Sequence, residues 1–257
     1  QGAIWGYKDN NKPVMLCEYE HAMGNSVGDL REYVDAFYAN PRSFGGFIWD
    51  FIDQGLRRGD SQYFNFGGLW GDNPNDDNFC SNGLVFPDRS LQPEIWEVKH
   101  QYRNIIVKDV DVSKGIVSIE SRFNFTNIRD LVDAVWSVKE DGKEIASGIV
   151  PSNLLNIDPL STKNVTVPFT VPSVKAGSEY YFDLDFQLKE STFWAEAGFS
   201  ITHEQFRISA GEALPARINI GSLPTMSAVE ENGTLNISGT DFAISVNLKT
   251  AAITDYQ

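Results

Sequence analysis

The stretch Pro13-Val-Met-Leu-Cys-Glu-Tyr-Glu-His-Ala-Met-Gly-Asn-Ser26 decides the fold of the first part of this chain. Residues 14–17 form a short continuous apolar run, which predicts a strand buried on both faces, as in a parallel sheet. Glu18 stands where this strand is expected to end, and His21 and Gly24 lie in the loop that follows. Because catalytic groups of α/β proteins gather at the carboxyl ends of parallel strands, Glu18 is the first candidate for a reacting group. An isolated carboxylate at such a position more often only marks a solvated strand end. The evidence for a catalytic role must therefore come from the neighbouring segments.

A helix and a second strand are predicted directly after this loop. Asn25-Ser26 has the composition of a helix N-cap, with Asp29 at the capping-box position, and the apolar spacing predicts a helix to about Asn40. Residues 44–54 then supply a second buried strand whose apolar run ends in Trp49. Strand, loop, helix and strand form a βαβ crossover, so the polar ends of both strands are expected on the same edge of the sheet.

The third informative segment runs from Gly67 to Arg89 and is too rich in Gly, Asn, Asp and Pro for regular structure. Long ordered loops are usually functional. Together with this loop's NDDNFCSNGLVFPDR (75–89), the motifs PVMLCEYEHAMGNS (13–26) and GGFIWDFIDQ (45–54) closely resemble the last third of the catalytic barrel of the glycoside hydrolase family 2 β-galactosidases. Three motifs in the right order and at the right spacing make the resemblance specific, which one motif alone would not.

The resemblance implies roles for the residues that match the family's motifs. Glu18 falls on the catalytic nucleophile, which attacks the anomeric carbon of galactose and becomes covalently bonded to it. His21 matches a histidine that contacts the sugar, and Trp49 matches the aromatic floor of the galactose site. Asp50, beside Trp49, is expected to belong to the substrate-binding group by orienting that ring.

A monovalent cation site is also implied by the resemblance. Phe79, through its backbone carbonyl, and Asn82 match residues beside a Na⁺ or K⁺ ion that helps to place the galactose 6-hydroxyl, so Asn82 counts as both a metal and a substrate residue. Asp76 is a weaker candidate. Glu20 stands where a small residue is common in the family, and strand alternation would point it the same way as Glu18 and raise the pKa of the nucleophile.

The chain is expected to be a piece of a larger enzyme, truncated at both ends. Retaining glycosidases need two carboxyl groups about 5 Å apart, one to attack and one to protonate the leaving group. In the family, the general acid/base and the Mg²⁺ ligands around it lie on earlier barrel strands, and a whole barrel takes about 250 residues. Residues 1–102 are therefore predicted to be the C-terminal portion of the (β/α)8 barrel. The chain alone is expected to be inactive and to need the remainder of the same polypeptide as its partner, with a galactoside as substrate.

Beyond residue 102 the pattern changes to the period-two alternation of strands. An immunoglobulin-like antiparallel sandwich is predicted over residues 103–210, with an Asp141-Gly142 hairpin turn. The expected strands lie at 115–125, 134–138, 164–171 and 179–188. Residues 193–201 resemble the end of the sandwich that follows the barrel in the same family.

A further β domain is predicted to begin in residues 211–257 and to be incomplete. Residues 211–215 have the composition of a linker, and strands are expected at 217–220, 234–238 and 242–248. About forty residues are too few for an independent sandwich. The fold class is therefore mixed, with partial α/β units, then an all-β sandwich, then the first strands of another β domain.

Composition limits the partners but does not settle the compartment. A formal net charge of −14 argues against nucleic acid or an anionic membrane surface, and no apolar run reaches the length of about 20 residues that a membrane helix needs. Cys17 and Cys80 are expected to be packed free thiols, and the three histidines lack the spacing of a zinc site. The chain is expected to be soluble, the sequence does not decide between the cytoplasm and the periplasm, and a homo-oligomer is left open.

Two alternatives remain open at this point. β-Glucuronidases and β-mannosidases of the same family share the architecture, although they generally lack a loop like NDDNFCSNG (75–83). In a different class, the chain would be a noncatalytic carbohydrate-binding or assembly module in which the sandwich is the working part.

Overall fold

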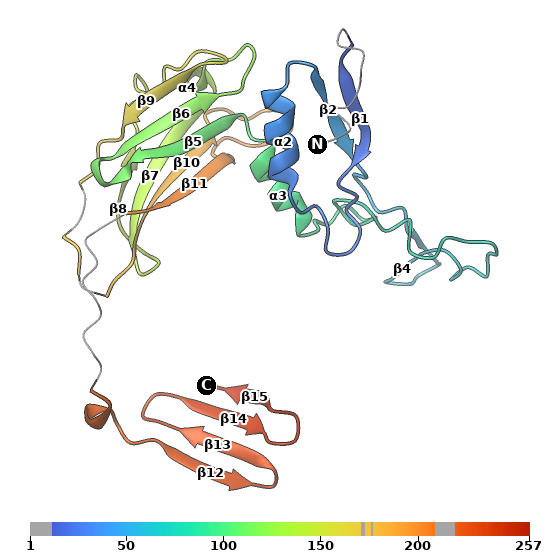
Figure 1. Cartoon of the computed structure of the whole chain (residues 1–257), viewed down its shortest axis with the longest axis vertical. Helices are drawn as coiled ribbons and strands as arrows, with labels where there is room; N and C mark the ends of the chain where they lie inside the picture. The colour runs from blue at the N-terminus through green and yellow to red at the C-terminus, as the bar shows by residue number, and fades with distance from the viewer. Residues whose placement is uncertain (1–11, 171–172, 176, 209–218) are drawn as a thin grey trace. The chain divides into compact units, whose positions relative to one another are not determined.

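The computed structural model describes residues 12–170, 173–175, 177–208 and 219–257 (Figure 1). Two compact units are distinguished by their internal contacts. The first contains residues 1–174 and 178–210, and the second contains residues 175–177 and 211–257.

The first unit begins with the predicted βαβ crossover. Strand β1 (Val14–Tyr19) pairs in parallel with β2 (Ser43–Ile48), and α2 (Leu30–Ala39) connects them (Figure 1). The apolar side of α2 packs against the strand pair, with Tyr19, Leu30 and Val34 in one buried cluster. The parallel pairing and the mixed fold class predicted from the sequence are therefore confirmed.

Two details of this crossover differ from the prediction. The sheet is not buried on both faces, since Met15, Phe44 and Phe47 are 47%, 76% and 61% exposed; among the described residues, helices cover only one side of the two strands. The helix also begins at Leu30, later than expected. Asp29 has a left-handed φ of 56° and its side chain makes no cap hydrogen bond, and Ser26 Oγ instead donates to the carbonyl of His21.

The segment after β2 is mostly irregular, as its composition predicts. It holds two short paired strands and isolated bridges, and it ends in a helix. The elements are β3 (Leu56–Arg57), β4 (Phe64–Asn65) and α3 (Glu94–Gln101). Residues 67–89 form turns and single bridges, without a helix or a named strand.

The second part of the first unit is the predicted antiparallel sandwich. One sheet has the strand order β11-β10-β7-β8 and the other β5-β6-β9. This is the arrangement of immunoglobulin-like folds, in which alternating inward side chains of both sheets share one core. The strands are β5 (Ile105–Asp111), β6 (Ile116–Ser121), β7 (Val132–Glu140), β8 (Lys143–Ile149), β9 (Thr162–Thr166), β10 (Tyr180–Leu188) and β11 (Ser200–Arg207), with short helices η1 (Val112–Lys114) and α4 (Ile128–Leu131) between them.

The alternation that predicted these strands also builds the core. Every second residue of β10 is buried, among them Phe182, Leu184 and Phe186. The predicted hairpin is present, because Glu140 pairs with Lys143 across Asp141 and Gly142, whose φ angles of 49° and 80° suit a two-residue turn. Strand β9 is shorter than expected and ends at Thr166, since Pro168 has no N–H to donate to a ladder.

The second unit is a four-stranded antiparallel meander. Its strands are β12 (Ser227–Glu231), β13 (Thr234–Ser238), β14 (Ala243–Asn247) and β15 (Ala252–Tyr256), and each pairs with the next. The strands expected at 234–238 and 242–248 are confirmed. The strand expected at 217–220 is wrong at its end, because Ile220 opens the 3-10 turn η2 (Ile220–Ser222), capped by the side chain of Asn219. Residues 217 and 218 and the expected linker at 211–215 lie outside the described residues.

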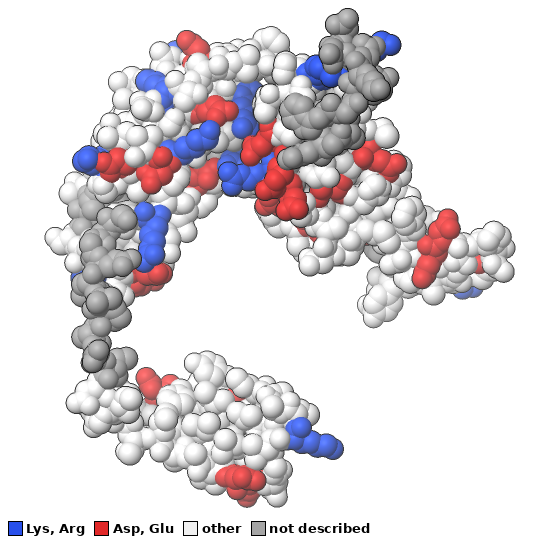
Figure 2. All heavy atoms as spheres, viewed as in Figure 1, with Lys and Arg blue, Asp and Glu red and all other residues white. Residues whose placement is uncertain are grey.

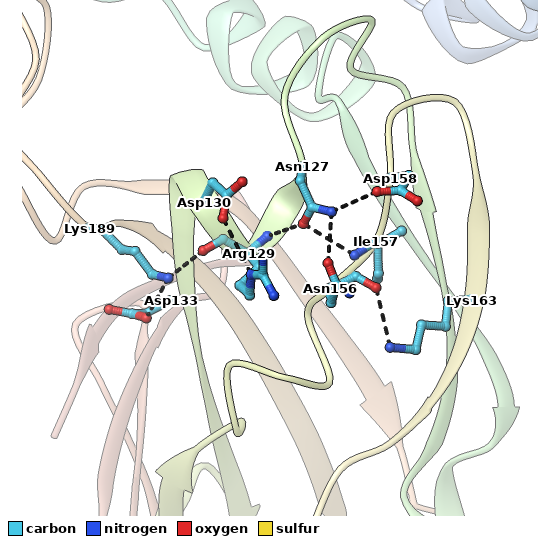
Figure 3. Close-up of polar contacts among 9 residues, drawn as sticks. All are labelled: Asn127, Arg129, Asp130, Asp133, Asn156, Ile157, Asp158, Lys163 and Lys189. Atoms are coloured by element: carbon cyan, nitrogen blue, oxygen red, sulfur yellow. Dashed lines mark hydrogen bonds and ion pairs between the residues drawn. The ribbon is translucent and has the colours of Figure 1, made fainter.

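One side-chain amide, that of Asn127, joins three segments at an end of the sandwich. Asn127 caps α4 by accepting a hydrogen bond from the Arg129 N–H at 3.1 Å, and it also accepts one from the Ile157 N–H (Figure 3). Its amide nitrogen donates to Asn156 Oδ1 and to Asp158 Oδ1, each at 3.0 Å. All four hydrogen-bonding positions of this side chain are therefore used.

We expect Asn127→Ala to lower the free energy of unfolding by about 1–2 kcal/mol, because it removes a helix cap and leaves the Ile157 N–H without its acceptor. Urea denaturation followed by tryptophan fluorescence would measure the change. The matched control is Asn124→Ala, at an exposed loop position three residues earlier. Equal stability of the two variants would contradict the bridging role.

Candidate active site

The carboxyl end of β1 carries a hydrogen-bonded pair of ionisable side chains. His21 Nε2 lies 2.7 Å from Glu18 Oε2. Both side chains are partly exposed, by 46% for Glu18 and 40% for His21. An ionised carboxylate can only accept, so the histidine N–H donates and fixes one carboxylate oxygen. The other oxygen of Glu18 remains able to face a ligand.

The carboxyl end of β2 brings Trp49 to the same place. The Trp49 N–H donates to the Tyr19 carbonyl at 3.0 Å, and the Ala22 N–H donates to the Trp49 carbonyl at 2.8 Å. These two bonds continue the parallel pairing beyond the strands. They place the rings of His21 and Trp49 with centroids 6.3 Å apart. The structure thus brings Glu18, His21 and Trp49 together, as their positions at two strand ends predict.

The irregular loop is attached to the end of β2 by its backbone. The Asp50 N–H donates to the Asn82 carbonyl at 2.5 Å, and the Leu84 N–H donates to the Asp50 carbonyl at 3.1 Å. Residues 50–54 and 80–85 therefore run side by side, with a parallel bridge between Ile52 and Val85. This pairing brings Asn82, which is 1% exposed, next to Asp50.

Asp53 fixes the loop and was not singled out by the sequence pattern. Its carboxylate accepts from the Gly83 N–H at 2.7 Å and from Gln92 Nε2 at 2.9 Å, and Gln92 also donates to the Gly83 carbonyl. A Cβ at position 83 would lie 2.1 Å from the Asp53 nitrogen, so only glycine fits. The Asn82-Gly83 dipeptide was the available signal, since glycine after asparagine in a loop marks close backbone approach.

The residues expected at the cation site are close together but supply few ligands. Asn82 Nδ2 donates to the Phe79 carbonyl at 2.9 Å. Within the described part of the chain, Asn82 Oδ1 is buried and has no hydrogen-bond partner, which suits an acceptor reserved for a cation. Two oxygens fall short of the six or so that a hard cation takes. The Asp76 side chain is exposed, and only its backbone carbonyl meets Phe79, at 3.2 Å from the Phe79 nitrogen.

No metal centre is formed by acidic, histidine and cysteine side chains within residues 12–170, 173–175, 177–208 and 219–257. Cys17 and Cys80 are both free thiols. Cys17 is exposed, contrary to the expectation of a packed thiol, because it lies on the uncovered side of the β1–β2 pair.

Two acidic side chains differ from their expected arrangement. Glu20 does not continue the strand alternation, because β1 ends at Tyr19 and Glu20 has a left-handed φ of 48°. Burial raises the pKa of Glu20, with a smaller contribution from the Asp29 carboxylate. The Asp50 carboxylate accepts a hydrogen bond from Nε2 of Gln54. Its side-chain partner is therefore Gln54, which does not belong to the Glu18 and His21 pair.

The charged residues do not form a continuous basic surface on the face drawn in Figure 2. Lysine and arginine side chains alternate there with aspartate and glutamate among the described residues. None of the described helices is both long enough and apolar enough to cross a bilayer.

Comparison with known proteins gives the family. Residues 4–107 match the TIM barrel domain of the glycosyl hydrolases family 2, and residues 117–209 match domain 4 of β-galactosidase. The chain belongs to glycosyl hydrolase family 2. The partial α/β region is the C-terminal part of this family's barrel. The sandwich corresponds to domain 4 of β-galactosidase.

Curated β-galactosidases are similar along most of the chain. That of Priestia megaterium is 37% identical over 235 residues, which are 90% of this chain and 22% of the relative. That of Photobacterium profundum is 39% identical over 225 residues, 85% of this chain and 21% of the relative. That of Psychromonas ingrahamii is 35% identical over 256 residues, which are 96% of this chain and 24% of the relative. The chain therefore spans less than a quarter of the length of these relatives.

We expect Gly83→Ala to release residues 80–85 from the end of β2, because the new methyl group would overlap the backbone of Asp53. The amides of Asp50 and Leu84, whose bonds cross this contact, should exchange their hydrogens at least about tenfold faster. Hydrogen exchange followed by NMR would measure this. Gly28→Ala is the control, because nothing lies within 4 Å of a Cβ built there, and unchanged protection in Gly83→Ala would contradict the close approach.

Proposed function

We propose that the chain is the nucleophile-bearing part of a retaining β-galactosidase and that Glu18 is the nucleophile. The observation that supports this most directly is the convergence of Glu18, His21 and Trp49 at the ends of two parallel strands. The family match and the similarity to three curated β-galactosidases supply the reaction class.

In the proposed reaction, Glu18 Oε1 attacks the anomeric carbon of the galactoside. A new C–O bond forms as the glycosidic C–O bond breaks, and the leaving oxygen takes a proton from the second carboxyl group, which lies in the remainder of the same polypeptide. Water then gives a proton to the second carboxylate and attacks the same carbon, which breaks the ester bond, releases galactose and restores the Glu18 carboxylate. His21 holds Oε2 through its Nε2–H, so that Oε1 keeps a fixed direction of attack.

The neighbouring side chains are assigned to binding. The half-exposed ring of Trp49 offers a flat apolar surface for the C–H groups of a pyranose. Asn82, fixed by the Phe79 carbonyl, keeps one buried oxygen for a Na⁺ or K⁺ ion, which would orient the substrate's 6-hydroxyl. Asp50 positions Trp49 through its place in the backbone pairing with Asn82. Mg²⁺ would be bound by the remainder of the polypeptide.

The alternatives are less well supported. A glucuronidase or a mannosidase would share the Glu18 chemistry, but the similar curated proteins are named β-galactosidases. A noncatalytic module does not require the Glu18 and His21 pair. A panel of aryl β-galactoside, β-glucuronide and β-mannoside substrates, given to the longer enzyme that contains this chain, would distinguish the sugars.

We expect the 257-residue chain alone not to hydrolyse nitrophenyl β-galactoside, because the proton donor of this family lies on earlier barrel strands. A spectrophotometric assay on the purified polypeptide checks this. Turnover that persists through purification and is lost in Glu18→Gln would show that the chain contains a complete active site.

In the longer enzyme, Glu18→Gln should reduce kcat by at least about a thousandfold, since an amide cannot form the ester intermediate. Glu20→Gln is the matched control and should retain most of the activity, because Glu20 lies outside the strand and its carboxylate neighbour is Asp29. A 2-fluorogalactoside that traps the covalent intermediate should label the peptide containing residues 13–26. Label on another peptide would contradict the assignment of the nucleophile.

A further inference from the structure

The sequence contains two Asn-Gly dipeptides, and the structure places them in opposite surroundings. Asn82-Gly83 lies in the candidate active site, where Asn82 is 1% exposed. Asn232-Gly233 forms the exposed turn between β12 and β13 in the second unit (Figure 1). Asparagine is a chemically labile residue, and a following glycine has no side chain to shield its backbone nitrogen. The same reaction can therefore be compared in two environments of one chain.

The exposed dipeptide forms a hairpin turn whose central peptide group is free. Glu231 pairs with Thr234, and the two residues between them have φ angles of 50° and 77°, which identifies a type I′ turn. Within residues 219–257, the peptide group that joins Asn232 to Gly233 makes no hydrogen bond through its carbonyl or its N–H. The Gly233 carbonyl, on the other side of that residue, accepts from the Leu248 N–H at 2.9 Å. The peptide group can therefore rotate without breaking a described hydrogen bond.

Rotation of this peptide group brings two reactive atoms together. Turning it over converts type I′ into type II′, in which the first turn residue keeps a positive φ and has a ψ of about −120°. Both types fit a two-residue hairpin, and glycine tolerates the negative φ that the second position then takes. At that ψ the nitrogen of the second residue is eclipsed with Cβ of the first, as in a five-membered ring. The Gly233 nitrogen then faces Cγ of Asn232.

The buried dipeptide is held at both ends of its peptide group. The Asn82 carbonyl accepts from the Asp50 N–H at 2.5 Å, and the Gly83 N–H donates to Asp53 Oδ1 at 2.7 Å. The side-chain nitrogen of Asn82 also donates to the Phe79 carbonyl, at 2.9 Å. Rotation of this peptide group would break the first two bonds in a buried setting, where unmade hydrogen bonds are costly. The fold therefore keeps the Gly83 nitrogen away from Cγ of Asn82.

We propose that Asn232 is a site of spontaneous deamidation and that the fold protects Asn82 from the same reaction. The Gly233 N–H loses its proton to hydroxide, and the nitrogen attacks Cγ of Asn232. The new N–Cγ bond forms as the Cγ–Nδ2 bond breaks, and the amide nitrogen takes a proton from water and leaves as ammonia. Water then opens the cyclic imide at one of its two carbonyls, which gives aspartate or isoaspartate. The site lies outside the candidate active site, so the proposal does not rest on the proposed function.

The product changes the turn in two ways. Either form carries a negative charge beside Glu230 and Glu231, and like charges repel. Isoaspartate also adds its Cβ to the main chain, so the two-residue turn no longer matches the register of β12 and β13. Among the described strands β12 pairs with β13 alone, and all five of its residues are exposed. Deamidation should therefore loosen the pairing of β12 first.

Peptide mapping of the intact 257-residue chain tests the proposal. The chain is incubated at mildly alkaline pH, and mass spectrometry follows the tryptic peptides 59–89 and 218–249, each of which contains one of the two dipeptides. We expect Asn232 to convert at least about tenfold faster than Asn82, because the Asn82 site reacts only after local opening. Labelling by an isoaspartyl methyltransferase should appear in peptide 218–249, and the rate should rise with pH.

Two controls separate the effect of the fold from that of the sequence. In urea the two sites should convert at rates within about threefold of each other, because the unfolded chain no longer holds Asn82. Asn232→Gln should remove the isoaspartyl label from peptide 218–249, since the longer side chain would have to close a six-membered ring. Equal rates at the two sites in the folded chain would overturn the proposal. An unconverted Asn232 in the folded chain, once the sample in urea has fully converted, would also overturn it.

Discussion

The parallel backbone pairing of β1 with β2 is the interaction on which the candidate active site depends. Side chains alternate along a strand, so a carboxylate and a tryptophan far apart in sequence meet only if the register of the two strands is fixed. The register runs from Val14 opposite Ser43 to Tyr19 opposite Ile48, and two further bonds extend it through Trp49 and Ala22. Directly after β2, the backbone of Asp50 pairs with the loop at Asn82, so successive backbone pairings hold both the proposed reacting group and the proposed binding groups.

Where regular pairing ends, single polar side chains take over its function. Asp53 holds Gly83 and Gln92, and at the end of the sandwich Asn127 holds α4 and the chain near Ile157. Each of these residues accepts backbone N–H groups that no strand neighbour satisfies. A net contribution of about 1 kcal/mol per bond is small, but an unsatisfied buried N–H costs more than that. Irregular segments can therefore be ordered without a large apolar core.

The sequence predicts an element well where the side-chain alternation extends over many residues. It predicts burial poorly, because burial depends on which other elements cover a face. The alternation in residues 179–188 predicts β10 to within one residue, and the Asp141-Gly142 turn predicts the β7–β8 hairpin, although β7 extends two residues beyond each expected end. The apolar run at 14–17 predicts the strand correctly but not its exposure, since burial depends on elements that a local pattern does not contain. The helix cap expected at Ser26 is also wrong, because the Ser26 hydroxyl donates its hydrogen bond to the carbonyl of His21. Asp53 itself gave no signal, since its importance arises only from contacts across the fold.

The two parts of the first unit differ in how much of their apolar surface they bury themselves. The sandwich encloses one large core in which Phe182 and Phe186 are fully buried, whereas the β1–β2 pair leaves Phe44 and Phe47 exposed among the described residues. The stable sandwich is therefore the platform, and the strands that carry the candidate active site depend on it through few contacts. Lys99 of α3 makes one such contact, because its Nζ lies 4.7 Å from the centroid of the Phe199 ring in the sandwich.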